Sequence, residues 1–299
     1  MLRRLERGAI LVLVSVLLLT VLGGVILAED ALHPAPGPQS ADKPTQIAAD
    51  TGSSYQDVQI TGSDGTVLGA WLFLPSRPHP SYAILLHGVR DTRVGMHVLI
   101  RMLLKDGYAV LAPDSRTNLV TYGVREANDV HLWADYLYQT QPVKNLYGLG
   151  ESMGAANLLQ SLPLETRFSA VVADSPFSTF TAIAHDRVEQ IFQSDSWPVR
   201  AITYPLVSAG FIYARLRYGV DLAAASPLDA VRHTSTPILL IHGLRDTKTS
   251  PQHSRILLLG NPSHITPWFV PKAGHTGAYS ADPAVFEQRV TTFFEAHQH

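Results

Sequence analysis

The chain has 299 residues, 46% hydrophobic and 16% charged, which suits one large α/β domain with appendages and excludes two full catalytic domains. Its formal net charge is −2 and no segment after residue 10 concentrates Lys or Arg, so we expect no nucleic-acid partner. The absence of cysteine excludes disulfides, thiolate zinc sites and a cysteine nucleophile.

The N-terminal segment predicts a membrane helix. Residues 1–7 form a basic flank with three arginines, and residues 8–28 are almost entirely apolar. About 20 apolar residues in a helix cross a ~30 Å hydrocarbon layer, whereas the apolar part of a signal peptide spans only about 7 to 15 residues. The length therefore favours a retained anchor over a signal peptide cleaved near Ala28. Basic flanks stay in the cytoplasm, so we expect the rest of the chain outside it, or secreted if the segment is cleaved.

Residues 29–53 are rich in Pro, Ala, Gly and Ser and predict a linker before a domain at 54–299. That domain opens with an antiparallel hairpin, residues 55–61 and 67–75, around a Gly-Ser-Asp-Gly turn. Short apolar runs then alternate with helical patterns, which indicates a largely parallel sheet with crossover helices. The expected strands lie within residues 82–88, 108–114, 143–150, 169–175, 237–243 and 265–275.

Helical patterns connect these strands. We expect helices near residues 95–106, 125–140, 153–161, 251–259 and 283–296. Residues 177–232 are too long for an ordinary connection and too apolar to be disordered. This segment predicts a helical cap over the site that forms where the parallel strands end.

A Gly-Glu-Ser-Met-Gly segment at residues 150–154 matches the Gly-x-Ser-x-Gly pattern of a nucleophile elbow. The pattern alone is a weak signal, but it lies between an expected strand and an expected helix. There Ser152 would expose its hydroxyl above the sheet, and the amide of Met153 would point at the carbonyl oxygen under attack. The alternative is a glycine-rich turn in which the serine only caps the helix.

A serine nucleophile needs a histidine base that an acid holds in orientation, in the chain order Ser, acid, His. Asp246 and His275 each follow a downstream strand in that order. Asp174 is the rival acid, with a turn cap as its alternative role. The competing histidines fit less well, because they lie before the last strand or in the C-terminal tail: His264, His297 and His299.

The second oxyanion donor should come from the loop after the strand at 82–88. There we choose the amide of Val89, with His87 and Gly88 shaping the turn. For Arg90 we expect an ion pair with Asp91 or Asp114 rather than a contact with a substrate carboxylate.

These motifs resemble the α/β-hydrolase superfamily, in its serine esterase, thioesterase and peptidase-like branch. The segments that carry the resemblance begin at residues 108, 150, 171, 226 and 270: YAVLAPDSR, GESMGAA, VVADSPFS, SPLDAVRHTSTPILLIHGLRDTKTSPQHS and VPKAGHTGAY. The resemblance implies an α/β fold, with a mostly parallel central sheet flanked by helices and a helical cap. It also implies hydrolysis of a small-molecule acyl substrate, an ester, thioester or amide, through an acyl-enzyme and without a cofactor. One departure is Thr247 to Pro251, where similar proteins carry a short Val-Pro or Ile-Pro.

Three alternatives stay open at the level of sequence. The first is an aminopeptidase-like or other amide hydrolase, because selectivity lies in the cap. Bulky cap residues, among them Phe177, Phe180 and Trp197, either line an acyl pocket or only pack the cap helices. The second is a non-catalytic, membrane-anchored binding protein on the same fold. The third, a metal-dependent hydrolase, lacks an HExxH spacing, and we expect no metal. Substrate identity, oligomeric state and pathway do not follow from the sequence.

Overall fold

The central sheet positions everything else in the molecule. The computed structural model describes residues 2–38, 40–76, 80–194 and 196–299. Its eight strands lie in the order β1-β2-β4-β3-β5-β6-β7-β8. Only the β1–β2 and β2–β4 pairings are antiparallel, so the sheet is mostly parallel, as predicted. The strands are β1 Ser54–Thr61, β2 Val67–Leu74, β3 Ser81–Leu86, β4 Ala109–Pro113, β5 Asn145–Glu151, β6 Phe168–Asp174, β7 Ile238–Gly243 and β8 Ile265–Val270.

The strand residues explain this architecture. Strands β3, β4, β6 and β7 are buried along their whole length, as expected of parallel strands covered on both faces. Strand β1, at the edge, is largely exposed, and Val58 is its one buried residue. Each strand that the sequence predicted is present, with ends that move by one or two residues except for β8, whose expected run extended into the following loop.

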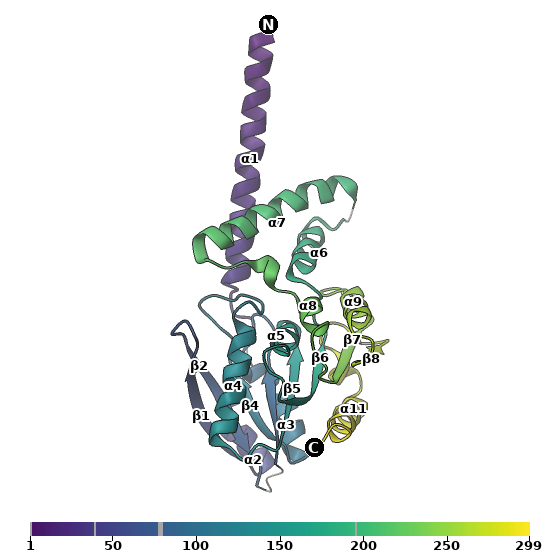
Figure 1. Ribbon diagram of the computed structural model, residues 1–299. Coiled ribbons are helices and arrows are strands. Elements are labelled where there is room, and N and C mark those ends of the chain that lie inside the picture. The colour runs from purple at the N-terminus through teal and green to yellow at the C-terminus, as the bar shows by residue number, and fades with distance from the viewer. Residues whose placement is uncertain (1, 39, 77–79, 195) are drawn as a thin grey trace.

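Helices cover both faces of the sheet. One face packs on α2 Pro44–Thr51, η1 Arg93–Met96, α3 His97–Lys105, α10 Ala278–Ala281 and α11 Pro283–Glu295. The opposite face packs on α4 Glu126–Thr140, α5 Met153–Ser161, α8 Pro227–Val231 and α9 Gln252–Gly260. Trp133 of α4 and Phe294 of α11, both fully buried, anchor the two layers. Figure 1 shows the sheet between these layers.

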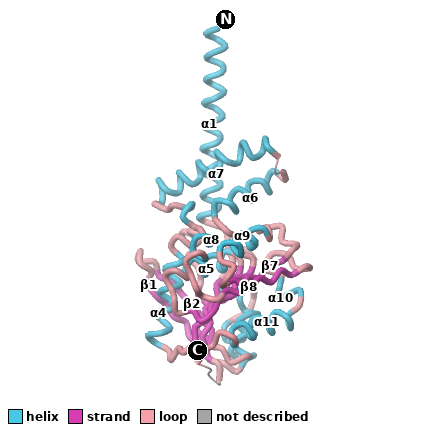
Figure 2. The backbone as a smooth tube through the Cα atoms, turned by 45° about the vertical axis from the view of Figure 1, so that its right-hand side comes forward, coloured by secondary structure: helices cyan, strands magenta, loops and turns pink. Residues whose placement is uncertain are grey.

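The insertion between β6 and β7 is helical, as predicted. It contains α6 Phe180–Phe192, α7 Trp197–Tyr218, the short η2 Leu222–Ala224 and then α8. Figures 1 and 2 show α6 and α7 above the ends of the strands, with α7 crossing α1. The cap therefore covers the edge of the sheet where the parallel strands end.

The N-terminal region is more structured than its composition predicts. Helix α1, Leu2–Leu32, extends past the expected apolar segment, and Glu6–Leu32 is long and apolar enough to cross a membrane or to serve as a signal sequence. Within residues 29–53, expected to be a linker, α2 begins at a proline and buries Ile47 and Ala48 in the core. Two buried side chains are too few to produce a helical hydrophobic period, so the sequence pattern missed α2. Residue 1 and the side chains of Arg3 and Arg4 lie outside the described part of the basic flank.

Candidate active site

Ser152 lies in the turn between β5 and α5. Its backbone angles are φ 53° and ψ −115°, a conformation that costs free energy in a residue other than glycine. The flanking glycines make this turn possible. A Cβ at Gly150 would lie 2.6 Å from the amide of Ala155, and one at Gly154 would lie 2.2 Å from the carbonyl oxygen of Leu86. Both glycines of the motif are therefore required by close backbone packing.

His275 and Asp246 meet Ser152 in one hydrogen-bonded chain. His275 Nε2 lies 2.8 Å from Ser152 Oγ, and His275 Nδ1 lies 2.7 Å from Asp246 Oδ2. With the proton on Nδ1 donated to the carboxylate, Nε2 is free to accept the proton of the serine hydroxyl. The structure thus brings the three predicted residues together, from the loops after β5, β7 and β8.

Asp246 is held as a carboxylate. Burial alone would raise the pKa of this carboxyl, but hydrogen bonds from His242, His275 and the Thr249 amide outweigh it, so the pKa lies well below its usual range. The Lys248 and Thr249 amides each donate to Oδ1 at 2.8 Å. The segment that departs from similar sequences therefore forms a turn that cradles the acid.

His242 is a buried neighbour that the sequence reasoning missed. Its Nε2 lies 3.3 Å from Asp246 Oδ2 and 2.9 Å from the Thr249 carbonyl oxygen, while Nδ1 lies 2.6 Å from Ser254 Oγ. The ring therefore joins the acid to the start of α9. A histidine in an otherwise apolar strand, directly before the Gly243 turn, was the only available signal.

The rival acid, Asp174, occupies a different environment. Its carboxylate accepts a hydrogen bond from Ser175 Oγ at 2.9 Å, and burial raises its pKa to about 7. Its backbone carbonyl accepts a hydrogen bond from the Ser152 amide at 2.8 Å. Burial, with the nearby Asp174 adding to it, also raises the pKa of Glu151 to about 8. Two acids beside the nucleophile are therefore largely or partly protonated near neutral pH.

Val89, whose amide is the second predicted oxyanion donor, lies in the loop after β3. His87 Nδ1 lies 2.8 Å from the Gly88 carbonyl oxygen, and its Nε2 accepts a hydrogen bond from the Ser115 amide at 2.9 Å. In a trans peptide the N–H points opposite to the carbonyl, so this contact turns the Val89 amide away from His87. Met153 is the first residue of α5, and its amide has no acceptor within the helix.

Arg90 differs from the expectation. It pairs with Asp30 of α1 at 3.0 Å rather than with Asp91 or Asp114. The Arg90 carbonyl oxygen also accepts a hydrogen bond from the Gly37 amide at 2.6 Å. Asp30 is distant in the sequence, so no local pattern could reveal this pair. The loop that carries Val89 is consequently tied to the end of α1 and the segment after it.

The three cap candidates for substrate contact have different surroundings. Phe177 and Phe180 are buried in a cluster beneath the cap, where Phe180 lies 4.2 Å from Tyr122 between ring centroids. The side chain of Trp197 is 81% exposed at the start of α7, so it does not line a buried pocket. The sequence could not distinguish inward from outward aromatics in an apolar helix.

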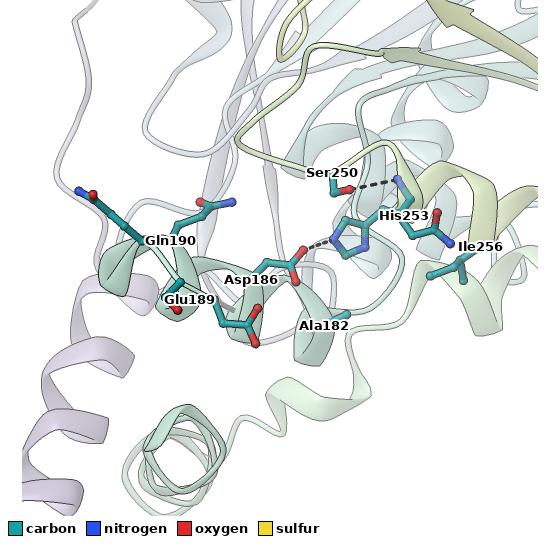
Figure 3. A pocket seen from close by; sticks show the side chains of 10 residues that line it. Ala182, Asp186, Glu189, Gln190, Ser250, His253 and Ile256 are labelled. Carbon is teal, nitrogen blue, oxygen red and sulfur yellow. Dashed lines mark hydrogen bonds and ion pairs between the residues drawn. The ribbon is translucent and has the colours of Figure 1, made fainter. Parts of the chain in front are cut away.

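A hollow of about 720 Å³ lies between α6 and the start of α9. Figure 3 shows Asp186 of α6 pointing at His253 of α9, with Oδ2 and Nε2 3.0 Å apart. Gln190, which also lines the hollow, donates to the Thr247 and Lys248 carbonyl oxygens in the acid turn. The hollow therefore adjoins the turn that carries Asp246.

One group of side chains that could hold a metal ion occurs among the described residues, away from Ser152. It consists of His131, Asp135 and Glu165. Arg167 forms ion pairs with both carboxylates, at 2.6 Å with Asp135 and closer with Glu165. The guanidinium of Arg167 already pairs with both acids, so this cluster is explained as an ion-pair network.

Comparison with known proteins identifies the family of this architecture. The model of the alpha/beta hydrolase family matches residues 83–289. The uncharacterized protein YqkD of Bacillus subtilis (strain 168) is 28% identical over 180 residues, 56% of this chain and 57% of that protein. The uncharacterized protein YfhR of Escherichia coli (strain K12) is 25% identical over 249 residues, 76% of this chain and 75% of that protein.

A solved structure shares the fold. The Pyrococcus furiosus esterase Pf2001 superposes with a TM-score of 0.68 at 23% identity, covering 89% of this chain and 100% of that one. At that identity the likeness establishes the fold alone, so the chemistry has to be argued from the residues around Ser152.

Proposed function

The chain belongs to the alpha/beta hydrolase family, and on that basis we propose that it is a serine hydrolase that cleaves a carboxylic ester or thioester. The observation that carries the proposal is the hydrogen-bonded chain from Ser152 through His275 to Asp246, with distances of 2.8 and 2.7 Å. Nucleophile, base and orienting acid within hydrogen-bond reach are what acyl transfer to serine requires.

The proposed reaction has two halves. His275 takes the proton of Ser152 as Oγ attacks the substrate carbonyl, and the amides of Val89 and Met153 stabilise the oxyanion. The protonated imidazole then gives its proton to the leaving alcohol or thiol, which leaves an acyl-enzyme. Water, deprotonated by His275, releases the acid and restores the serine. No step requires a cofactor or a metal.

Two other functions are compatible with the same fold. An aminopeptidase-like or other amide hydrolase would use the same three side chains, and the reaction would differ only in its leaving group, an amine instead of an alcohol or thiol. A non-catalytic, membrane-anchored binding protein would have no need for the hydrogen-bonded serine, histidine and acid. Ester, thioester and amide substrates with the same acyl group separate these possibilities.

We also propose that α1 is a retained, single-pass membrane anchor. The segment around Ala28 is part of the folded domain, because Glu29 accepts a hydrogen bond from Tyr218 at 2.7 Å and the Leu32 carbonyl accepts one from Val120 at 2.9 Å. Cleavage near Ala28 would detach the end of α1, which holds these contacts, from the rest of the helix. The basic flank would stay cytoplasmic and place the hydrolase domain outside the cytoplasm.

The test of the enzymatic proposal compares the full chain with its Ser152→Ala variant on p-nitrophenyl esters of increasing acyl length, matched thioesters and aminoacyl p-nitroanilides. We expect the full chain to hydrolyse the esters or thioesters and the Ser152→Ala variant to show no turnover of them. Turnover of anilides alone would favour the amide hydrolase. No turnover of any class would favour the binding protein.

The proposed topology has a separate test. Full protection of the C-terminal domain from protease added outside spheroplasts would contradict it.

A further inference from the structure

Cap helix α7 has two sides of opposite character. Its buried residues recur every three or four positions, at Thr203, Val207, Gly210 and Ala214, and face the rest of the protein. Three exposed residues each follow a buried one by two positions: Pro205, Ile212 and Leu216. At about 100° per residue, two positions turn a helix by ~200°, so these side chains lie on the opposite side.

We call Pro198, Pro205, Ile212 and Leu216 the outer face of α7. Ile212 is 59% exposed and Leu216 is 82% exposed. Trp197 and Ile202, which border this face, are also exposed. An exposed apolar stripe of this size on one helix is typical of an interaction surface rather than of a solvated helix.

The contact with α1 fixes the position of this face along the anchor. A Cβ at Gly24 would lie 2.7 Å from Ala209 Cβ and 2.8 Å from the Gly210 amide nitrogen. The two helices therefore touch through small residues, as helices in membranes do. Directly N-terminal to this contact, α1 exposes a continuous apolar surface that includes Leu18 and Leu22.

The depth of α7 follows from the length of the apolar segment. Gly24 precedes the last apolar residue of that segment, Ala28, by four positions, or about 6 Å at 1.5 Å per residue. Interfacial amphipathic helices lie about 5 to 10 Å into the boundary between headgroups and acyl chains. Figures 1 and 2 both show α7 running across α1 rather than along it. A membrane crossed by α1 would therefore have α7 near its plane, at its surface.

We propose that the outer face of α7 rests in the boundary between headgroups and acyl chains of the lipid bilayer that α1 crosses. The occupant of this face is thus the membrane itself. Tryptophan is favoured at that depth, and the exposed Trp197 lies beside the face, whereas the ring of Tyr204 packs on His185 of α6. Arg215 and Arg217, on either side of Leu216, can reach lipid phosphates. The inference rests on the proposed membrane anchor and does not depend on the proposed hydrolase activity.

Site-specific labelling of the full chain in phosphatidylcholine vesicles tests this docking. Because the chain has no cysteine, single Leu18→Cys, Ile212→Cys and Leu164→Cys variants each carry one environment-sensitive dye. Leu18 lies in the expected span. Leu164 is 56% exposed, close to the 59% of Ile212, but lies between α5 and β6 at the opposite edge of the sheet. An unfolding temperature equal to that of the unlabelled chain shows an intact fold.

The readout is quenching by spin-labelled lipid. We expect about a twofold or larger loss of emission at positions 18 and 212 and little change at position 164. Quenching at position 18, together with as little quenching at position 212 as at position 164, would overturn the docking but would still support the anchor. No quenching at position 18 would overturn the anchor and the docking together. Ester turnover, measured separately, is unaffected by either failure.

Discussion

His275 Nε2 lies 2.8 Å from Ser152 Oγ, although the two residues are 123 positions apart in the chain. They meet because β5 and β8 end at the same edge of the sheet, and because the strained turn at Ser152 lifts its hydroxyl toward the loop after β8. This contact gives the serine hydroxyl a proton acceptor.

A matched pair of substitutions tests which acid orients His275. We expect Asp246→Asn to lower kcat/KM by about 10³-fold or more, because an amide no longer holds the histidine in the required tautomer. Asp174→Asn should change it by less than about tenfold, since this buried carboxyl is partly protonated near neutral pH. Steady-state ester kinetics on both variants decide the point. The reverse order would make Asp174 the acid.

The strands of the sheet and the turn at Ser152 could be predicted from the sequence. Gly150, Ser152 and Gly154 are local features whose steric role is visible in five residues, and the parallel strands are recognisable from their apolar runs. The choice between Asp246 and Asp174 was open, because it depends on which loop reaches His275. His242 and the pair of Arg90 with Asp30 were not predictable, since each joins segments that only the folded sheet brings together.

A close backbone contact holds the loop that carries His275. A Cβ at Gly243 would lie 2.3 Å from the carbonyl oxygen of Gly274, whereas one at Gly274 would have no other atom within 4 Å. We therefore expect Gly243→Ala to displace the His275 loop, lowering both kcat and the unfolding temperature. Gly274→Ala should preserve both. Thermal unfolding and ester kinetics on the two variants check this, and equal effects would show that the contact does not position His275.

The Gly88 carbonyl oxygen lies 2.8 Å from His87 Nδ1 and accepts a longer hydrogen bond, at 3.3 Å, from the Asp91 amide. Replacing His87 with alanine should remove the shorter contact, loosen the Val89 amide and lower kcat by about 10²-fold, with KM nearly unchanged. His264→Ala, at an exposed histidine, is the control. A loss confined to KM would indicate that the loop binds substrate and does not stabilise an oxyanion.

Glu151 should make stability fall as the pH rises. Its pKa is about 8 in the folded chain and near 4.5 when unfolded, so between these values the folded state binds more protons. Unfolding free energy should therefore decrease across that range, by about 1 to 3 kcal/mol at pH 7. Glu151→Gln should remove this part of the dependence. Urea unfolding at pH 5 and pH 8 measures it, and identical pH profiles for both chains would refute the prediction.

The proposed role of Ser152 is tested most directly by covalent labelling of the full chain with a fluorophosphonate, which reacts with activated serines. Peptide mass spectrometry should find the adduct on Ser152, with no labelling of Ser152→Ala and labelling at least about 10²-fold slower in His275→Gln. An adduct on another serine, or undiminished labelling of the Ser152→Ala variant, would contradict the assignment of Ser152 as the nucleophile.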